Sequence, residues 1–313
     1  MSQLYFGGAR RANFLSQVFN SSKYSLGQSR SLCHEAPGMS AVETRTHGDS
    51  VFVISLNRPE KRNAVDAATA SLLAKTFRQF EQDESLRVAV LTGNGGNFCA
   101  GYDLKFLAES GSSAGEDLIR TLTAGEEDTG LGPMGPSRYH LSKPLIAAVS
   151  GYAVAGGLEL SLVADMRVAD ETATFGVFCR RFGVPLIDGG TVRLPKLIGL
   201  SRALDMILTG RPVRAQEALA FGLANRVVPP GDALSTALEI AASIASFPPH
   251  AMNADRTSAI RAAYGGLPLA DTLRQEALDG ADALIDGQAW NNASGFVQGT
   301  GRHGKFGSPS SKL

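Results

Sequence analysis

The sequence predicts an α/β protein with a helical C-terminal region, and three observations support that fold class. Short β-rich runs alternate with segments of helical spacing as far as about residue 199. Beyond that residue the apolar spacing is helical, which predicts a C-terminal region made of helices. Glycine, with 35 residues, clusters in the middle of the chain, where it allows tight turns and close backbone approach. Strands that alternate with helices favour a parallel sheet, because the crossover helices cover both of its faces.

The expected elements follow from apolar spacing and from turn residues. Apolar or β-rich runs bounded by turn residues predict strands over 51–57, 87–96, 145–151 and, as a strand pair, 166–176. Helical spacing predicts helices over 68–85, 104–109 (opened by Asp103), 155–165, 203–210, 215–222, 237–245 and 271–285. The Gly-, Ser- and acid-rich stretch 110–136 is typical of a mobile surface segment.

Composition argues against several classes of function. The 313 residues include 30 Lys and Arg against 30 Asp and Glu, so no overall field favours nucleic acid or an anionic membrane surface. No apolar run reaches the length of a transmembrane helix, so no membrane span is expected. Cys33, Cys99 and Cys179 are widely spaced and odd in number, which argues against a disulfide framework. The histidines show no ligand spacing with these cysteines, so no metal site is expected.

Both ends of the sequence resemble targeting signals. The first 34 residues are basic and Ser-rich, with no acidic residue before Glu35. This composition is typical of a mitochondrial transit peptide; a disordered tail and an internal start at Met39 are the alternatives. The sequence ends in Ser311-Lys312-Leu313, a peroxisomal address that an import receptor reads. We therefore expect a peroxisomal protein, with a mitochondrial pool if the N-terminal segment is retained.

One charged residue stands out within an apolar run. The stretch AGGLEL, residues 155–160, places Glu159 behind two glycines where the chain otherwise has the pattern of buried core. A buried carboxylate without a partner costs several kcal/mol or takes up a proton. A chain that keeps one there has usually given it a chemical task, so Glu159 is a catalytic candidate. A structural carboxylate held in a salt bridge is the alternative.

Two glycine-led helix starts offer backbone donors. Gly101 precedes Tyr102 where one predicted helix begins, and Gly156 and Gly157 open another. N–H groups in the first turn of a helix are unpaired and lie at the positive end of its dipole, so they bind negative oxygen. Two such groups that converge would polarise a carbonyl, as an oxyanion hole does.

Five stretches together resemble the crotonase superfamily, also called the enoyl-CoA hydratase/isomerase family. They occur in the family's order across roughly residues 45–295. The stretches are LNRPEKRNAV, VLTGNGGNFCAGYDL, KPLIAAVSGYAVAGGLELSLVADMRVA, FGVPLIDGGTVRLPKLIG and ILTGRPVRAQEALAFGLANRVV. The resemblance implies a crotonase-type spiral of ββα units, a homotrimer or homohexamer, and an acyl-CoA substrate. It implies no metal and no cofactor apart from the coenzyme A of the substrate.

The resemblance also assigns roles to single residues. The backbone N–H groups of Tyr102 and Gly156 match the family's oxyanion hole, and Glu159 matches its first catalytic glutamate. The positions that match coenzyme A contacts are Arg62, Asn63, Ala64, Ala100, Gly101 and Asp103.

One position departs from the family pattern. Cys179 stands where true hydratases carry a second glutamate, and it is expected to be a half-buried residue without thiolate chemistry. Asp188, before a Gly-Gly turn, matches a carboxylate of the dienoyl-CoA isomerase branch, so Glu159 and Asp188 form a candidate catalytic pair. The alternative for Asp188 is an N-cap of the next helix, since Asp is a preferred capping residue.

These observations leave two functions open. The first is an enoyl-CoA hydratase/isomerase-type enzyme that acts on unsaturated fatty acyl-CoA thioesters through an enolate, in fatty-acid β-oxidation. The second is a catalytically weak homologue that binds acyl-CoA.

The expected organisation is a targeting segment or tail over 1–38, a ββα spiral core with the acyl-CoA site over 39–210, a helical region over 211–300, and a flexible tail over 301–313.

Overall fold

The computed structural model of the chain describes residues 40–111, 131–285 and 288–298. The segments with the two targeting signals, 1–38 and 311–313, lie outside the described residues, so both signals stay predictions. Within the described ranges, no helix is both long enough and apolar enough to cross a membrane.

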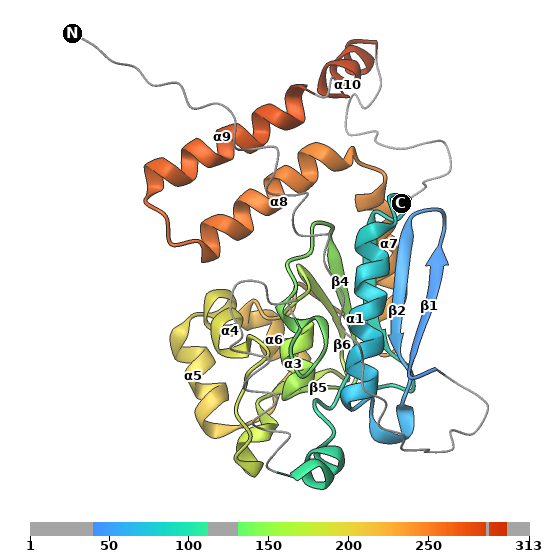
Figure 1. The fold of residues 1–313 in the computed structure, drawn as a ribbon, viewed down its shortest axis with the longest axis vertical. Coiled ribbons are helices and arrows are strands. Elements are labelled where there is room, and N and C mark those ends of the chain that lie inside the picture. Colours follow the sequence, from blue (N-terminus) through green and yellow to red (C-terminus); the bar gives the residue numbers. More distant parts are fainter. Residues whose placement is uncertain (1–39, 112–130, 286–287, 299–313) are drawn as a thin grey trace, which may run out of the picture. The chain divides into compact units, whose positions relative to one another are not determined.

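A six-stranded sheet is the main sheet of the fold (Figure 1). Its strands lie in the order β1 (Val42–His47), β2 (Val51–Leu56), β3 (Val88–Gly93), β4 (Leu145–Val149), β6 (Met166–Asp170) and β9 (Arg226–Val228). β1 and β2 form an antiparallel hairpin, and each later pair of neighbours is parallel. A smaller sheet joins β5 (Tyr152–Val154), β7 (Thr174–Gly176) and β8 (Val213–Arg214).

Both faces of the main sheet are buried. Successive side chains of a strand point to opposite faces, and β2 shows the result. Ile54 packs in one apolar cluster with α1 (Ala67–Gln82), whereas Val53 packs in another with α7 (Ala233–Ala245). Both side chains are 0 % exposed. This two-sided cover explains why the strands of the core are nearly continuous apolar runs.

The other described helices are short near the site and longer toward the C-terminal end. They are η1 (Pro59–Lys61), a helical segment over 104–111, η2 (Pro136–Arg138), α3 (Gly156–Ser161), η3 (Phe178–Phe182), α4 (Gly190–Ile198), α5 (Leu200–Thr209), α6 (Ala215–Phe221), α8 (Pro249–Tyr264), α9 (Leu269–Ile285) and α10 (Gln288–Val297). Arg256 of α8 forms an ion pair with Asp165, with Nε 2.9 Å from Oδ1, which ties α8 to the residue just before β6.

Two expectations about the elements are wrong. Residues 166–176 do not form a strand pair, because β6 belongs to the main sheet and β7 to the smaller one. The described end of 110–136 is not a surface segment, since Met134, Gly135 and Pro136 are buried. The mostly helical region after residue 199 also contains β8 and β9, two and three residues long, which are too short to show a strand period.

The topology brings two loops together at one edge of the sheet. β3 and β4 are parallel neighbours, so the segments that follow their carboxyl ends meet there. The segment after β3 leads to Tyr102, and the segment after β4 leads through β5 to α3. A bridge between Cys99 and Ala153 joins them. In open α/β sheets this edge is where ligands bind.

Candidate active site

The two predicted oxyanion donors lie on these neighbouring loops. Cys99 N donates to Tyr152 O at 2.8 Å, and Val154 N donates to Cys99 O at 3.1 Å. These hydrogen bonds fix the spacing between the segment that carries Tyr102 and the segment that carries Gly156.

The residues on either side of Tyr102 in the sequence form hydrogen bonds with Val65. Val65 N donates to Gly101 O, and Asp103 N donates to Val65 O, each at 2.8 Å. In a parallel bridge of this kind, the N–H of the central residue, here Tyr102, points away from its partner strand. The N–H of Tyr102 is therefore directed away from Val65.

Gly156 is the first residue of α3, so its N–H has no acceptor within the helix. The residue before it, Ala155, has φ 53° and ψ −126°, a strained conformation that costs about 1–3 kcal/mol. A Cβ on Gly101 would lie 3.0 Å from Gly156 N, and a Cβ on Gly156 would lie 2.6 Å from Met134 Sδ. The close approach of the two loops thus depends on glycine at position 101, and glycine at position 156 leaves room for the side chain of Met134.

Glu159 lies in the first turn of α3 and is 2 % exposed. Its Oε1 accepts hydrogen bonds from Asp188 N at 2.9 Å and from Gly190 N at 2.8 Å, where α4 begins. Burial, and then the negative charge of Asp188, raise the pKa of Glu159 from 4.5 to about 7 against the effect of these two donors. Among the described residues no ion pair reaches Glu159, so they give no support to the salt-bridge alternative.

Asp188 lies in the turn before α4 and is 3 % exposed. Its Oδ1 accepts hydrogen bonds from Met134 N at 3.0 Å and from Ser137 Oγ. The N-cap of α4 is Gly189, with no side-chain hydrogen bond, so the capping alternative for Asp188 is wrong. Burial raises the pKa of Asp188, and the hydrogen bonds from Ser137 and Met134 oppose that rise.

In each carboxylate, described residues anchor one oxygen by hydrogen bonds and leave the other unbound. No described residue hydrogen-bonds Oε2 of Glu159 or Oδ2 of Asp188. Two buried carboxyl groups with raised pKa values, one of them raised in part by the charge of the other, are suited to giving and taking protons.

The two described cysteines are both buried. Burial, followed by the charge of Glu159, raises the pKa of Cys179 in η3, so its thiol stays neutral. Cys99 Sγ donates to Asn63 O at 3.1 Å, and burial raises the pKa of Cys99 to about 12. A neutral thiol at position 179 cannot supply the charge of a second glutamate. Across the described residues, no group of three or more His, Cys, Asp or Glu side chains could hold a metal ion.

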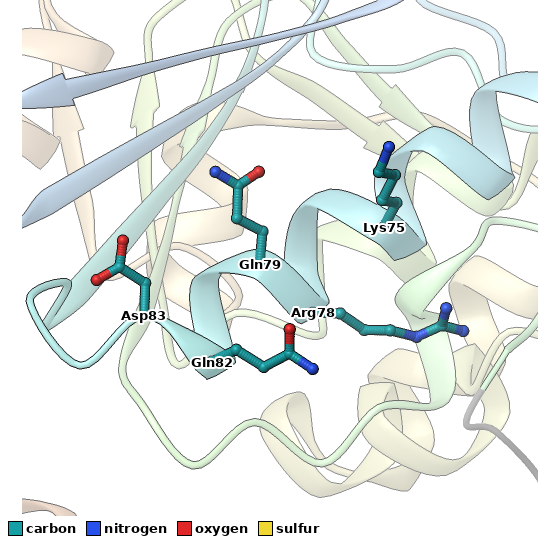
Figure 2. A pocket seen from close by; sticks show the side chains of 5 residues that line it. All are labelled: Lys75, Arg78, Gln79, Gln82 and Asp83. Carbon is teal, nitrogen blue, oxygen red and sulfur yellow. The ribbon is translucent and has the colours of Figure 1, made fainter. Parts of the chain in front are cut away.

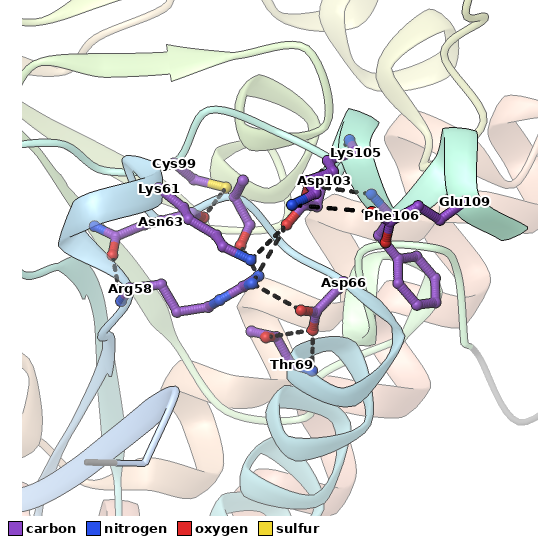
Figure 3. Close-up of polar contacts among 11 residues, drawn as sticks. Arg58, Lys61, Asn63, Asp66, Thr69, Cys99, Asp103, Lys105, Phe106 and Glu109 are labelled. Atoms are coloured by element: carbon purple, nitrogen blue, oxygen red, sulfur yellow. Dashed lines mark hydrogen bonds and ion pairs between the residues drawn. The ribbon is translucent and has the colours of Figure 1, made fainter. Parts of the chain in front are cut away.

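The predicted coenzyme A loop folds around Asn63 (Figure 3). Arg62 and Asn63 both have left-handed backbone, with φ values of 50° and 57°. The fully buried Asn63 side chain accepts a hydrogen bond from Arg58 N at 2.8 Å. It donates to Asn94 O at 2.9 Å and to Asn97 O at 2.6 Å. The side chain of Asn63 therefore organises the loop and is not available to a ligand.

Arg58 joins two acidic residues beside this loop (Figure 3). Its Nη2 lies 2.8 Å from Asp66 Oδ2 and 3.3 Å from Asp103 Oδ2, and Lys61 Nζ is also 3.3 Å from Asp103 Oδ2. Asp103 Oδ1 accepts N–H bonds at the start of the helical segment 104–111. Burial alone would raise the pKa of both acids, but hydrogen bonds and the nearby cations outweigh it and lower both pKa values.

The other predicted coenzyme A contacts differ in exposure. Arg62 is exposed, and its guanidinium carbon lies 5.4 Å from the ring centroid of Tyr152. Ala64 and Ala100 are half-buried, and Ala100 N donates to Arg62 O at 3.0 Å, whereas Gly101 is buried. Of these residues, Arg62 is the one whose charged group could reach a phosphate. The roles in binding coenzyme A stay predictions.

Two hollows lie outside this site. One, of about 1040 Å³, has Ser137, Gly189 and Arg193 among its lining residues and extends to α8. The other, of about 490 Å³, lies along α1 (Figure 2) and is lined by Lys75, Arg78, Gln79, Gln82 and Asp83. Neither lining includes the two catalytic candidates or the two backbone donors, so acid–base chemistry is not expected in either hollow.

Three residues around the carboxylates were not predicted from the sequence. Met134 and Ser137 lie in a Gly- and Pro-rich stretch, a composition typical of surface loops. Met134, a large apolar side chain in a polar stretch, was the one sequence signal from which the burial of this stretch could have been predicted. Arg193 of α4 donates from Nη1 to Asp188 O at 3.1 Å, and an arginine in an amphipathic helix carries no such signal in the sequence.

The sequence model of the enoyl-CoA hydratase/isomerase family matches residues 46–278. The chain belongs to this family. Among similar proteins, carnitinyl-CoA dehydratase of Proteus mirabilis is 42 % identical over 208 residues, which cover 66 % of this chain and 75 % of that protein. Enoyl-CoA hydratase EchA19 of Mycobacterium tuberculosis is 38 % identical over 220 residues, which cover 68 % and 77 %.

Solved structures of the family share the fold. The crystal structure of enoyl-CoA hydratase EchA1 from Mycobacterium marinum matches with a TM-score of 0.73 and 34 % identity, covering 82 % of this chain and 96 % of that one. The predicted crotonase superfamily and fold class are therefore confirmed. The protein is a crotonase-type enzyme of acyl-CoA metabolism. The roles of its individual site residues stay predictions.

Proposed function

We propose that the protein hydrates, or moves the double bond of, an unsaturated fatty acyl-CoA thioester through an enolate. The observation that supports this most is the buried pair Glu159 and Asp188, in which described residues anchor one oxygen of each carboxylate and both pKa values are raised. The N–H groups of Tyr102 and Gly156 would hold the thioester oxygen. Charge grows on that oxygen as the enolate forms, and fixed donors stabilise it more than the neutral carbonyl.

Hydration would divide the proton transfers between the two carboxyl groups. Asp188, as the base, takes a proton from water while the water oxygen bonds to Cβ and the π electrons move onto the thioester oxygen. Glu159, with a pKa of about 7, can carry a proton near neutral pH and gives it to Cα as the carbonyl re-forms. Isomerisation of a 3-enoyl thioester would remove a proton from Cα and return one at Cγ, with no net change in atoms.

Two substrates separate these reactions. Hydration of crotonyl-CoA by the purified full-length protein would appear as loss of the conjugated enoyl-thioester absorbance, and isomerisation of a 3-enoyl-CoA as gain of it. Glu159→Gln should abolish either signal, and the matched control Glu171→Gln, at an exposed carboxylate, should leave it unchanged. If acyl-CoA binds in calorimetry but neither substrate turns over, the protein is instead the weak acyl-CoA-binding homologue that Cys179 favours.

A third substrate follows from the relatives. One similar protein carries the name carnitinyl-CoA dehydratase, and dehydration is hydration run in reverse. The same pair of carboxyl groups could serve either direction, since a general acid in one direction is the general base in the other. Carnitinyl-CoA therefore belongs in the substrate panel, with dehydration measured as gain of absorbance.

We also propose a homotrimer or homohexamer that needs no cofactor beyond the substrate's coenzyme A. Exposed apolar side chains on the C-terminal helices support self-association: Leu269 is 74 % exposed, Ile285 80 % and Trp290 69 %. Sedimentation equilibrium would give the number of subunits, and turnover after dialysis against a chelator would test the absence of a metal.

The proposed location is the peroxisome, through Ser311-Lys312-Leu313, with a mitochondrial pool directed by residues 1–38. Either location would suit a role in fatty-acid β-oxidation. Imaging of the protein before and after deletion of each signal tests this proposal. A distribution that ignores the loss of the last three residues would contradict the peroxisomal part.

A further inference from the structure

Ser137 is a fully buried serine whose hydroxyl serves a catalytic candidate. Its Oγ donates to Oδ1 of Asp188, a residue 51 positions further along the chain. Ser137 lies in η2, and none of the proton transfers proposed above uses it. A buried hydroxyl directed at a buried carboxylate can fix the geometry and the charge of that carboxylate.

The chain around Ser137 is shaped to admit this hydrogen bond. Gly132 and Gly135 exchange two backbone hydrogen bonds of 2.8 Å, and Gly135 has a left-handed φ of 82°. A Cβ on Gly132 would lie 2.2 Å from Ser137 Oγ and 2.3 Å from Asp188 Oδ1. Any side chain at position 132 would therefore displace the hydroxyl or the carboxylate.

We propose that Ser137 is a positioning residue for the reaction: with the N–H of Met134, it fixes Oδ1 of Asp188 so that Oδ2 faces the reacting carbons. This inference rests on the proposed function. Two donors on one oxygen hold the plane of the carboxylate, because rotation about its terminal torsion would break both hydrogen bonds. With Met134 alone, the carboxylate would have more torsional freedom, and Oδ2 would be aligned less often.

The hydroxyl also favours the ionised form of Asp188, since a donor stabilises the charge it binds. The titratable and charged groups that face Asp188 are Glu159 of α3, Arg193 of α4, Arg138 of η2, and Cys99 and Tyr102 of the segment after β3. All of them remain when Ser137 is changed. Loss of the hydroxyl should therefore raise the pKa of Asp188, and the smaller charge on Asp188 should lower the pKa of Glu159.

The test compares two buried serines. Ser137→Ala removes the hydroxyl without adding volume, and the control Ser161→Ala removes another fully buried hydroxyl, which donates to Leu158 O at 2.7 Å. With crotonyl-CoA, we expect Ser137→Ala to lower kcat about tenfold with little change in KM. The acid limb of its pH profile should move to higher pH. Ser161→Ala should show neither change.

A second measurement does not depend on turnover. The side-chain carboxyl ¹³C resonance of Asp188, assigned by its loss in Asp188→Asn, should titrate at higher pH in Ser137→Ala than in the unchanged protein. If the unchanged protein turns over no acyl-CoA thioester, the proposed function fails, and this titration still tests the contact. An unchanged titration, or equal losses of kcat in both serine variants without a shift of the acid limb, would overturn the role of Ser137.

Discussion

Two pairs of acidic side chains in this protein have pKa values that move in opposite directions. Glu159 and Asp188 have raised pKa values, whereas Asp66 and Asp103 have lowered ones. Burial acts in the same direction on all four. In the second pair, hydrogen bonds from Thr69 to Asp66 and from Phe106 and Lys61 to Asp103 outweigh burial, and the positive charges of Arg58 and Lys61 add to them. The first pair is more deeply buried, and among the described residues no ion pair reaches it.

This difference separates structural carboxylates from the ones proposed to be catalytic. A carboxylate bound by a guanidinium is fixed as an anion and cannot exchange a proton near neutral pH. A carboxylate anchored through one oxygen by N–H or O–H donors keeps its other oxygen for the substrate. Arg193 lies near Asp188 but does not bind its carboxylate, because its Nη1 donates to the backbone carbonyl of Asp188.

The largest expected effect comes from neutralising either member of the first pair. Glu159→Gln and Asp188→Asn should each lower kcat by about 100- to 10,000-fold with KM largely kept, because each removes a group that moves a proton. Asp103→Asn, in the second pair, should lower kcat far less. Steady-state kinetics with crotonyl-CoA measure all three. A nearly silent Asp188→Asn beside an inactive Glu159→Gln would leave Glu159 working alone.

The next largest expected effect concerns the proposed backbone donors of the oxyanion hole. Gly156→Ala should cost about 100- to 1,000-fold in kcat, since its Cβ would meet Met134 Sδ at 2.6 Å and shift the N–H. Met134 is flexible, so the fold should survive, and circular dichroism should be unchanged. Gly157→Ala is the contrast, because its Cβ would lie 2.1 Å from Cys99 O, a backbone atom, and should destabilise the fold. Near-normal activity in Gly156→Ala would place the thioester oxygen elsewhere.

Stability at high pH should also distinguish the pairs. The pKa of Glu159 in the folded protein, about 7, lies above its ordinary 4.5, so the native state holds this proton more tightly. The resulting stability is complete below pH 4.5 and is lost as pH rises through 7. Above that pH the ionised, buried carboxylate costs of the order of 3 kcal/mol. Glu159→Gln should therefore gain stability relative to the unchanged protein between pH 5 and pH 8, measured by urea unfolding. A constant difference would contradict the raised pKa.

The smallest effect concerns the second pair at low pH. The pKa of Asp103 lies below its ordinary 3.8, so the stability it contributes is present above pH 3.8 and is lost as pH falls through the lower, folded value. Asp103→Asn keeps a capping side chain but removes the ion pairs, and should cost about 1–3 kcal/mol near neutral pH. Urea unfolding at pH 7 and pH 3 would measure this. A loss of the same size at both pH values would show that Asp103 acts through its shape alone.

The sequence by itself predicted most of the central strands and helices and the place where a carboxylate enters the core. The run over 51–57 predicted β2, and the spacing over 68–85 predicted α1, because one face or both faces of each element must be apolar. Glu159 was visible for the same reason, as a carboxylate within a run whose other side chains are buried. β1, β5, β8, β9, α8 and α10 were not predicted. β5 has three residues, and α8 has no fully buried residue, so neither shows a clear period.

Only the tertiary structure decided what each polar side chain of the site contacts. Asp188 receives its hydrogen bonds from a loop 51 residues earlier and donates its N–H to a residue 29 positions away. Periodicity tells which face of an element is buried, but the order of the strands decides which loops meet, and neighbouring residues do not encode that order. The family resemblance assigned Asn63 and Asp103 to coenzyme A binding, and that assignment stays a prediction. Only the fold shows that the side chain of Asn63 hydrogen-bonds within its own loop and that Asp103 pairs with Arg58. The fold likewise places the side chain of Ser137 against that of Asp188.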